Sequence, residues 1–365
     1  MKHPLTDRFD HSADVLADIA ARVPDTTDHL AGTTQIINTY HPRRLTLKVT
    51  EVIPETPTTK TFRLSRPDNT DLPPFLAGQY VALFADGTNR PYAIASSPAR
   101  LSHYDLTIRR VLNGRISNLL LDELSVGDTV TTSGPMGTFH HNPLFHGNSV
   151  VFLAGGSGVV PAMSMIRDIV DHGLDRRLHL IYGSRDESDI IFFDELAVAH
   201  PNITVDHVIG DLLTSDVITA LAGPLDNRMV YVCGPQQMYP FALEQLTALG
   251  HPRRRIRFEA NGAPADPTSQ PHWPADADPT EQVTVTARGR TFRTPRNRPL
   301  LDALEDNGIQ PESACRSGEC SLCRVRVCSG TVHNASEAKL RLTDAAYGYT
   351  HSCVAYPLTD VDLDV

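Results

Sequence analysis

The pattern of apolar and polar positions changes along the chain and predicts domains of different architecture. Short β-type runs separated by Pro and Gly turns predict an antiparallel β-barrel that ends near residue 145. From residue 149, apolar strands alternate with helical patterns, one from about Pro161 to Gly173 and one near Phe193, which predicts a doubly wound parallel α/β sheet. The runs of the barrel are 45–53, 59–64, 78–84, 92–97, 104–112 and 126–134.

The ends of the chain and one internal stretch follow other patterns. Residues 11–23 place Val15, Leu16, Ile19, Ala20 and Val23 on one face and predict a short amphipathic helix. Residues 263–280 are rich in Pro, Ala and Asp and predict a stiff linker. A hairpin-like pair of strands and a helix over 299–308 follow it. The predicted segments are an N-terminal extension (1–42), the barrel (43–146), the α/β domain (147–262), the linker (263–280) and a C-terminal domain (281–365).

Composition narrows the range of partners and locations. With 41% hydrophobic and 21% charged residues, the chain is ordinary globular material for two or three domains. The net charge of -10 argues against nucleic acid and against an anionic membrane as the main partner. The first residues lack the pattern of a secretory signal, and no apolar run is long enough for a transmembrane span. We therefore expect a cytoplasmic protein with a protein or small-molecule partner.

Four of the six cysteines have the spacing of a metal centre. Cys315, Cys320 and Cys323 form C-x4-C-x2-C, and Cys353 follows at a distance, which is the spacing of plant-type 2Fe-2S ligands. The small residues between them suit a tight loop whose amides approach the sulfurs. A structural zinc site is the alternative, but it more often uses two C-x-x-C knuckles or histidines. Cys328, in a strand-like run, is interpreted as a core residue.

Residues 281–365, with ACRSGECSLCRVRVCSG and YTHSCVAYP, resemble plant-type 2Fe-2S ferredoxins. The resemblance implies an α+β domain of β-grasp type and makes the four spaced cysteines its cluster ligands.

Three motifs in the barrel segment point to a flavin. Arg90, Pro91 and Tyr92 combine a phosphate-binding fork with an aromatic face that can cover a flat ring. Gly114-Arg115-Ile116-Ser117 opens a helix, where free amides and the helix dipole favour a pyrophosphate. A Gly-Pro-x-Gly-x-Phe turn over 134–139 follows.

In this order the motifs resemble the ferredoxin-NADP reductase superfamily over residues 43 to about 262. The resemblance implies that Arg90 and Tyr92 bind the flavin phosphate and ring. It also implies that Gly114, Ile116 and Ser117 bind the diphosphate of FAD. The helix start favours FAD over FMN, although reductases with this domain order include both.

One residue departs from the superfamily pattern. Ala93 stands where relatives have Ser or Thr near the reactive nitrogen of the flavin. Hydride transfer then relies on positioning alone, or Ser96 supplies the missing hydroxyl. A second departure is Asn261, where some relatives have an aromatic residue that covers the flavin.

A second group of motifs points to a nicotinamide nucleotide. Gly155, Gly156, Gly158 and Pro161 lie in a glycine-rich turn between an apolar strand and a helix, where the backbone can approach a dinucleotide. The spacing is not that of an ordinary Rossmann fingerprint. Residues 182–185 and 233–238 follow the next strand and the last one.

The same superfamily resemblance assigns roles to these later residues. It places Cys233, followed by Gly234 and Pro235, beside the nicotinamide, and Ser184 and Arg185 near the adenine ribose. An inert buried thiol is the alternative for Cys233. Acidic residues over 186–189 favour NADH over NADPH, because a 2'-phosphate requires Lys or Arg.

The three motif groups predict one electron path. NADH gives up two electrons as hydride, a 2Fe-2S cluster accepts one, and a flavin links the two steps. The favoured function is an NADH-dependent flavin and iron-sulfur reductase whose redox partner is an oxygenase, either a Rieske non-haem iron enzyme or another monooxygenase. The alternatives are a reductase of a metal-cluster or corrinoid protein, and a ferredoxin-like carrier module whose flavin half has lost hydride chemistry.

Ala93 gives the first test. We expect Ala93→Ser to leave flavin binding intact and to change the rate at which NADH reduces the flavin, because it restores a hydroxyl at that position. Rapid mixing with NADH under anaerobic conditions measures this rate. An unchanged rate would count against a role for the missing hydroxyl.

Overall fold

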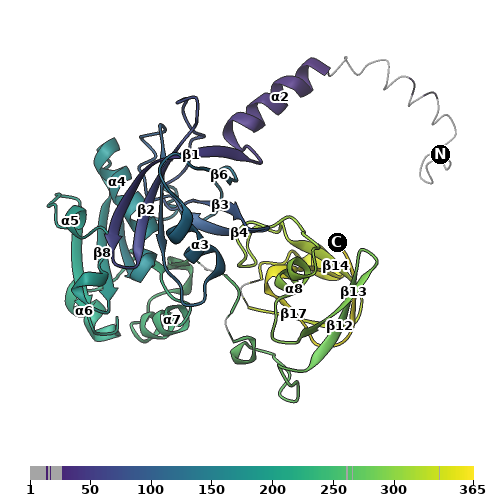
Figure 1. Cartoon of the computed structure of the whole chain (residues 1–365). Coiled ribbons are helices and arrows are strands. Elements are labelled where there is room, and N and C mark those ends of the chain that lie inside the picture. Colours follow the sequence, from purple (N-terminus) through teal and green to yellow (C-terminus); the bar gives the residue numbers. More distant parts are fainter. Residues whose placement is uncertain (1–13, 15–16, 18–26, 260–261, 265, 337) are drawn as a thin grey trace. The chain divides into compact units, whose positions relative to one another are not determined.

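The computed structural model describes residues 14, 17, 27–259, 262–264, 266–336 and 338–365 (Figure 1). The chain divides into two compact units, residues 1–43 and 44–365. The helix predicted over 11–23 lies almost wholly outside the described residues, and so does Asn261. Among the described residues, no helix has both the length and the apolar character needed to span a membrane.

The first unit contains a helix that the sequence pattern did not predict. Helix α2 (Thr27–Tyr40) has no proline, and its residues 31–40 are all exposed, including Ile36 and Ile37. Because the helix buries no stripe of apolar side chains in this range, it lacks the periodic pattern that reveals an amphipathic helix.

The second unit begins with the predicted antiparallel barrel. Its six strands follow the order β4-β3-β6-β1-β2-β5, and a bridge between Ile94 and Leu106 joins the two ends of the sheet. In β1, alternate residues from Leu45 to Val49 are buried in the barrel core, as expected for a strand with one face in water. The elements are β1 (Leu45–Thr56), β2 (Thr59–Ser65), β3 (Tyr80–Ala85), β4 (Thr88–Ala93), β5 (Tyr104–Arg109), α3 (Arg115–Glu123) and β6 (Thr129–Thr132).

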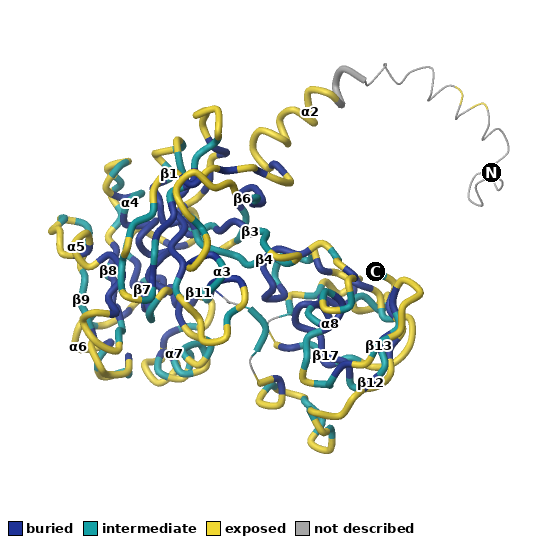
Figure 2. The backbone as a smooth tube through the Cα atoms, in the orientation of Figure 1, coloured by how far each residue is buried: buried dark blue, intermediate teal, exposed yellow. Residues whose placement is uncertain are grey.

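The next domain is the predicted parallel sheet, with strand order β11-β10-β7-β8-β9. Apolar clusters cover both of its faces, and Figure 2 colours most of β7 and the middle of β8 as buried. The sequence pattern predicted α4 and α5, but α6 and α7 were not predicted. The elements are β7 (Ser149–Gly155), α4 (Val159–His172), β8 (Arg177–Ser184), α5 (Phe193–Leu196), β9 (Ile203–Ile209), α6 (Ser215–Ala222), β10 (Met229–Cys233), α7 (Met238–Ala248) and β11 (Ile256–Phe258).

The C-terminal domain is α+β, as predicted. Its five-stranded sheet has the order β13-β12-β18-β14-β16, with β12 and β18 parallel, and Leu300 and Leu304 of α8 pack into the core of the domain. The elements are β12 (Gln282–Ala287), β13 (Arg290–Pro295), α8 (Leu300–Asp306), β14 (Arg324–Ser329), β15 (Val332–Asn334), α9 (Leu342–Ala346), β16 (Tyr349–His351), β17 (Ala355–Pro357) and β18 (Val361–Asp364).

The interpretation of Cys328 as a core residue is wrong. Cys328 is exposed on β14, whereas Val325 of the same strand is buried. Side chains alternate between the two faces of a strand, so the valines of the run take the inner face and Cys328 takes the outer one.

The segment predicted as a linker packs on the C-terminal domain. The ring of Trp273 lies with its centroid 5.3 Å from that of His333 and 6.3 Å from that of Tyr356. The hydroxyl of Tyr356 donates to the carbonyl oxygen of Pro264 at 3.0 Å, and Gln270 accepts from the backbone N–H of Ser336. The described part of this segment is therefore fixed along the domain that follows it.

One glycine sets how closely β10 approaches the turn before α4. A Cβ on Gly158 would lie 2.0 Å from the carbonyl oxygen of Cys233 and 2.7 Å from the backbone nitrogen of Gly234. Both obstacles are backbone atoms of a buried region, so a side chain there forces the turn and the strand apart.

We expect Gly158→Ala to lower the free energy of unfolding by about 2 kcal/mol, the usual scale of overpacking. Urea denaturation of the full chain measures the change. Gly183→Ala is the matched control, because its Cβ would have ordinary contacts, the nearest at 3.6 Å from the carbonyl oxygen of Ala154. Equal losses in the two variants would show that the close approach at Gly158 is not the cause.

Candidate functional site

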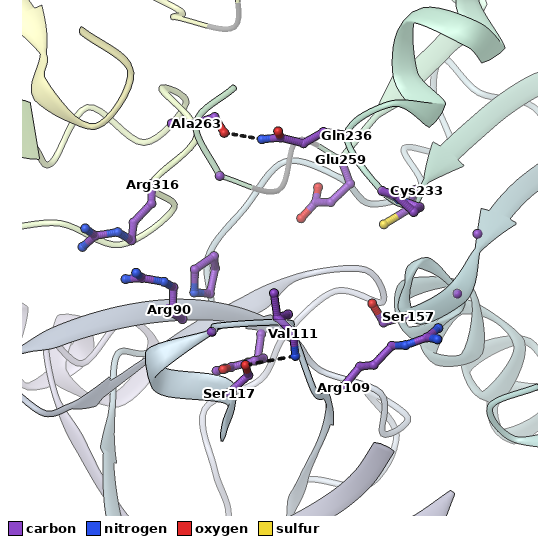
Figure 3. Close-up of a pocket in the computed structure, with 18 of the residues that line it drawn as sticks. Arg90, Arg109, Val111, Ser117, Ser157, Cys233, Gln236, Glu259, Ala263 and Arg316 are labelled. Carbon is purple, nitrogen blue, oxygen red and sulfur yellow. Dashed lines mark hydrogen bonds between the residues drawn. The ribbon is translucent and has the colours of Figure 1, made fainter. Parts of the chain in front are cut away.

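One large cavity of about 1890 Å³ opens between the barrel, the parallel-sheet domain and the C-terminal domain. Figure 3 shows Arg90 and Arg316 on one side of it, and Cys233 and Glu259 on the other. The ends of β7, β8 and β10 line it, and so do β4 and the start of α3. A ligand in this cavity would therefore meet strand ends of a parallel sheet, the usual position of a nucleotide in such folds.

The four spaced cysteines come together in the C-terminal domain. The side chain of Cys315 hydrogen-bonds with those of Cys320 and Cys353, and Cys323 hydrogen-bonds with Cys353. In the described part of the chain, no group of three or more His, Cys, Asp or Glu side chains converges on a single metal ion. A two-iron cluster does not require such a point, because each iron takes two of the four cysteines.

The loop that holds three of these cysteines, residues 315–323 and here named the cluster loop, turns its amides toward sulfur. The N–H groups of Ser317 and Cys320 donate to Sγ of Cys315 at 3.4 and 3.3 Å, and that of Gly318 donates to Sγ of Cys353 at 3.3 Å. Positive φ angles at Arg316 (53°), Gly318 (80°) and Ser321 (61°) make this turn possible. A left-handed φ is costly at residues other than glycine, such as Arg316 and Ser321. Because this costly backbone turns the amides toward sulfur, the loop fits a thiolate-bound cluster.

Strand β4 carries the first predicted flavin residues along the cavity. One Nη of Arg90 donates to the carbonyl oxygen of Asn89 at 2.7 Å and to Oγ1 of Thr88 at 3.2 Å. Burial and then the nearby Arg316 lower the pKa of Arg90, and burial raises the pKa of Tyr92. Arg316 is paired with Asp302 and Glu305, so Arg90 is the guanidinium here that suits an anion such as a phosphate. Pro91 and Tyr92 also line the cavity.

The structure separates the two residues considered for the missing hydroxyl. Ala93 lines the cavity, but Ser96 is not among its lining residues. The Ser96 hydroxyl is buried, accepts from the N–H of Asp105 at 3.2 Å and donates to the carbonyl oxygen of His103 at 3.4 Å. The Ser96 hydroxyl therefore stabilises the backbone of residues 103–105. The geometry gives no reason to assign it the role of the hydroxyl that is missing at Ala93.

The start of α3 leaves donors available at the cavity. Gly114 precedes the helix without a side-chain cap, so the first-turn amides lack a partner of that kind. A Cβ on Gly114 would lie 2.6 Å from Oγ of Ser117 and 2.8 Å from Cβ of Val111, so the tight turn requires glycine. Gly114, Ile116 and Ser117 all line the cavity, and this arrangement fits a pyrophosphate.

The predicted glycine-rich turn follows β7. Gly155, Gly156 and Pro161 line the cavity, whereas Gly158 instead faces the backbone of Cys233. At Gly156 φ is 52°, and a Cβ would lie 2.7 Å from an Nη of Arg109. This turn therefore allows the barrel arginine to reach the parallel-sheet domain.

A buried carboxylate joins that arginine to the end of β8. Asp189 accepts from Arg109 at 2.7 Å and from Arg185 at 2.7 and 2.8 Å, and it is 7% exposed. Burial opposes its ionisation, but the hydrogen bonds from Arg185 and Arg109 hold the pKa of Asp189 below its usual value. Ser184 and Arg185 line the cavity, so the charge of Arg185 is already balanced by protein.

The carboxyl end of β10 gives the last group. Cys233 is buried, lines the cavity with Gly234 and Pro235, and interacts with the hydroxyl of Tyr239. Glu259 follows β11, and its carboxyl group faces the same cavity (Figure 3). Burial, followed by the charges of Glu319 and Cys315, raises the pKa of Glu259 well above its usual value.

The sequence analysis did not identify Glu259, Arg109 or Arg316 as lining residues. Glu259 lies in the run FEANGAP, where only Asn261 was examined. A lone acidic residue after a strand has no spacing that reveals its position, and the two arginines reach the cavity only through the tertiary fold.

Family models match the three domains in the order predicted. An oxidoreductase FAD-binding domain matches residues 46–141, an oxidoreductase NAD-binding domain matches 152–244, and a 2Fe-2S iron-sulfur cluster binding domain matches 283–358. The match at each motif group agrees with the cavity and loop geometry. The chain therefore has binding domains for FAD, a nicotinamide nucleotide and a 2Fe-2S cluster.

Several known proteins are similar to this chain over most of their length. The chain is 31% identical over 338 residues to the ferredoxin reductase component of 3-ketosteroid-9-alpha-monooxygenase from Mycolicibacterium smegmatis, covering 87% of this chain and 95% of that protein. It is 30% identical to phthalate dioxygenase reductase from Burkholderia cepacia, covering 74% and 81%. It is also 30% identical to the NADH oxidoreductase HCR of Escherichia coli, covering 80% and 90%.

A solved structure of phthalate dioxygenase reductase, described as a modular structure for electron transfer from pyridine nucleotides to [2Fe-2S], is similar in fold. Its TM-score is 0.68 at 28% identity, with 88% of this chain and 98% of that chain covered. The domain order, the cavity shared by three domains and these similarities lead to one conclusion. The chain belongs to the family of NAD(P)H-dependent flavin and iron-sulfur reductases that serve as reductase components of oxygenase systems.

Proposed function

We propose that this reductase supplies single electrons from NADH to a separate oxygenase protein, either a Rieske non-haem iron enzyme or another monooxygenase. The observation that carries the proposal is that residues of all three domains line one cavity. Residues of β4, of the ends of β7, β8 and β10, and Cys353 of the C-terminal domain all line it. An arrangement of this kind brings a hydride donor, a flavin and a cluster to one place.

The barrel residues hold the flavin in this proposal. Arg90 binds a phosphate, and the first-turn amides of α3, with Gly114, Ile116 and Ser117, bind the diphosphate of FAD. Tyr92 covers one face of the ring, and Pro91 and Ala93 form the strand beside it. Ala93 offers no proton donor or acceptor at the ring, so the strand positions the flavin by shape.

The parallel-sheet residues hold NADH. Gly155, Gly156 and Pro161 let NADH come close to the backbone of the turn after β7. Ser184 and Arg185 face its adenine ribose. Gly234 and Pro235 line the cavity next to Cys233, which lies beside the nicotinamide, where its buried thiol excludes water. When bound, FAD accepts hydride from NADH and passes electrons singly to the 2Fe-2S cluster.

The C-terminal domain holds the cluster through Cys315, Cys320, Cys323 and Cys353. Amides of the cluster loop already point at two of these sulfurs, at 3.3 to 3.4 Å. Such hydrogen bonds stabilise negative charge on sulfur and so raise the potential at which the site accepts an electron. Leu322, near the end of the loop, is exposed and gives a partner access to this region.

The names of similar proteins support an oxygenase as the partner. They include reductase components of 3-ketosteroid-9-alpha-monooxygenase and of glycine betaine monooxygenase, and phthalate dioxygenase reductase. The cytoplasmic location and the segment boundaries derived from the sequence remain predictions.

A second candidate is a reductase of a metal-cluster or corrinoid protein, the alternative from the sequence; the similarity to the NADH oxidoreductase HCR of Escherichia coli, whose name specifies no oxygenase, is consistent with it. The two candidates differ only in the acceptor. The NADH-reduced chain is mixed in parallel with a purified oxygenase and with a purified metal-cluster protein. The acceptor that is reduced faster identifies the correct candidate.

Replacement of one cluster ligand tests the electron path. We expect Cys320→Ser to retain NADH-dependent reduction of ferricyanide, which takes electrons from the flavin. The same variant should lose at least tenfold in the reduction of cytochrome c, because that protein acceptor takes electrons from the cluster. Absorption spectra and iron content of the purified variant measure cluster loss.

Cys328→Ser is the matched control, because Cys328 is exposed and outside the ligand set. It should leave both rates and the iron content unchanged. If NADH bleaches neither the flavin nor the cluster of the unaltered chain under anaerobic conditions, the proposed function is wrong.

The carboxylate of Asp189 tests the preference for NADH. In Asp189→Asn the guanidinium of Arg185 loses its charged partner and becomes available to a 2'-phosphate. We expect the ratio of kcat/KM for NADPH to that for NADH to rise about tenfold, which corresponds to about 1.4 kcal/mol. Steady-state ferricyanide reduction with each nucleotide measures the ratio.

Asp206→Asn is the control for this change. Asp206 lies in the same sheet, pairs with His179 at 2.6 Å and does not line the cavity, so it makes the same change in charge elsewhere. An equal rise of the ratio in both variants would attribute the effect to net charge and not to Arg185.

A further inference from the structure

A buried asparagine joins the strand of the predicted flavin motif to the cluster-bearing domain. Asn89 lies on β4 immediately before Arg90 and is 3% exposed. Its Nδ2 donates to the carbonyl oxygen of Ser313 at 3.0 Å and to Oγ of Ser313 at 2.6 Å. Ser313 precedes the first ligand, Cys315, by two residues. One side chain therefore links the two redox sites through their supporting backbones.

The orientation of this amide is costly and specific. Oδ1 of Asn89 is buried and has no hydrogen-bond partner among the described residues. The reversed orientation would place Oδ1 against the carbonyl oxygen of Ser313, where two acceptors repel. A buried polar atom without a partner destabilises a fold. The two hydrogen bonds from Nδ2 of Asn89 to Ser313 offset the cost of burying Oδ1 without a partner.

Neighbouring contacts hold the same two segments together. Nε2 of Gln310 donates to the carbonyl oxygen of Gly87 at 3.0 Å, in the turn between β3 and β4. Oγ1 of Thr88 donates to Glu305 of α8 at 3.0 Å. All of these contacts are directional hydrogen bonds, which fix relative position more narrowly than apolar contact does.

Arg316 fixes the first turn of the cluster loop. It is 6% exposed and donates to Oγ1 of Thr88 at 3.0 Å, to Glu305 at 2.8 Å and to Asp302 at 2.5 Å. The two carboxylates belong to α8 of its own domain, whereas Thr88 belongs to β4. The arginine therefore completes a charge-balanced contact from the cluster loop to the strand that carries Arg90.

The middle of the cluster loop also touches the barrel. Oγ1 of Thr138 donates to Glu319 at 2.7 Å, and Arg257 donates to the carbonyl oxygen of Thr138 at 2.7 Å. The chain is thus held at Ser313 just before the loop, at Arg316 near its start and at Glu319 at its middle. Contacts at three separate points restrict rotation of this segment about any one of them.

We propose that Asn89 is a positioning residue for electron transfer, which holds the cluster loop against β4 at the distance that lets an electron pass from the flavin to the cluster. The proposal rests on the proposed function, because it takes the flavin and cluster sites as assigned there. Electron transfer falls steeply with distance, and redox contacts use small interfaces. Loss of two buried hydrogen bonds is therefore enough to lengthen the average separation.

The experiment separates the two steps in the intact holoprotein. Anaerobic rapid mixing with NADH follows flavin reduction first and cluster reduction second, by their absorbance. In Asn89→Ala we expect flavin reduction at the rate of the unaltered protein and cluster reduction slowed about tenfold. The electron paramagnetic resonance spectrum of the reduced cluster should be unchanged, because none of its ligands is altered.

A second variant distinguishes the donor from the shape of the side chain. Asn89→Asp keeps the size of the side chain but removes both donors, so it should slow cluster reduction at least as much as Asn89→Ala. Ser313→Ala removes one acceptor and retains the carbonyl oxygen, so it should have an intermediate effect. Asn202→Ala is the matched control, because the Asn202 side chain donates to the carbonyl oxygen of Leu174 within the parallel-sheet domain.

Hydrogen exchange provides a readout independent of turnover. We expect Asn89→Ala to increase amide exchange in residues 311–322, with no increase in the parallel-sheet domain. Ser313→Ala keeps the test decisive if the Asn89 variants do not fold. The proposal is overturned if both electron steps slow equally, if neither slows, or if Asn202→Ala reproduces the effect. A failure of the proposed function looks different, because the unaltered protein would then show no flavin or cluster reduction.

Discussion

Hydride moves only between atoms that are already in contact, and this requirement governs how the barrel and the parallel sheet meet. The carboxylate of Asp189 lies between Arg109 of the barrel and Arg185 of the parallel-sheet domain, and it is the buried charge of the cavity wall at which the two domains meet. Asp189 is buried, whereas Arg185 is largely exposed and Arg109 is partly buried, and Arg109 needs a glycine at position 156 to reach the carboxylate. Removal of the carboxylate would leave the partly buried guanidinium of Arg109 without its counter-charge.

The two contacts of the barrel are made by different means. Toward the parallel sheet, the contact combines a buried ion pair with apolar packing of Ala77, Ala95 and Phe139, and with hydrogen bonds from Ser164 and Arg167 to the backbone of residues 95 and 96. Toward the C-terminal domain, it includes hydrogen bonds made by the turn before β4, by the first residues of β4 and by Thr138. The first kind suits a permanent architecture, and the second suits a contact that has to hold a set position without a large apolar surface.

The sequence was sufficient where the chemistry depends on local spacing. Cys315, Cys320 and Cys323 are close in the chain, and the strand patterns of the barrel and the parallel sheet gave the correct fold class. Contacts between distant segments have no such signature, so Asn89 and Glu259 were not recognised. Helix α2 was missed because the described part of it buries nothing, and Cys328 was misplaced because one residue of register decides which face of a strand it occupies.

Sequence resemblance also has a limit at Ala93. It identified the departure from the superfamily pattern, but the candidate replacement, Ser96, was selected by proximity in the chain. The hydroxyl of Ser96 is already engaged with the backbone of His103 and Asp105. A hydroxyl near in sequence is not a hydroxyl near in space, and strand ends, where the chain leaves the sheet, are where this distinction matters most.

The packing of Trp273 on His333 and Tyr356 has a consequence for where the molecule can be divided. A fragment that starts at the first strand of the C-terminal domain would lack this ring and would expose the apolar surface beneath it. A fragment that starts near Ala263 would keep its own cover. Natural recombination of such modules, or their exchange in the laboratory, would therefore favour junctions before Ala263. The segment that contains Trp273 would then stay with the C-terminal domain.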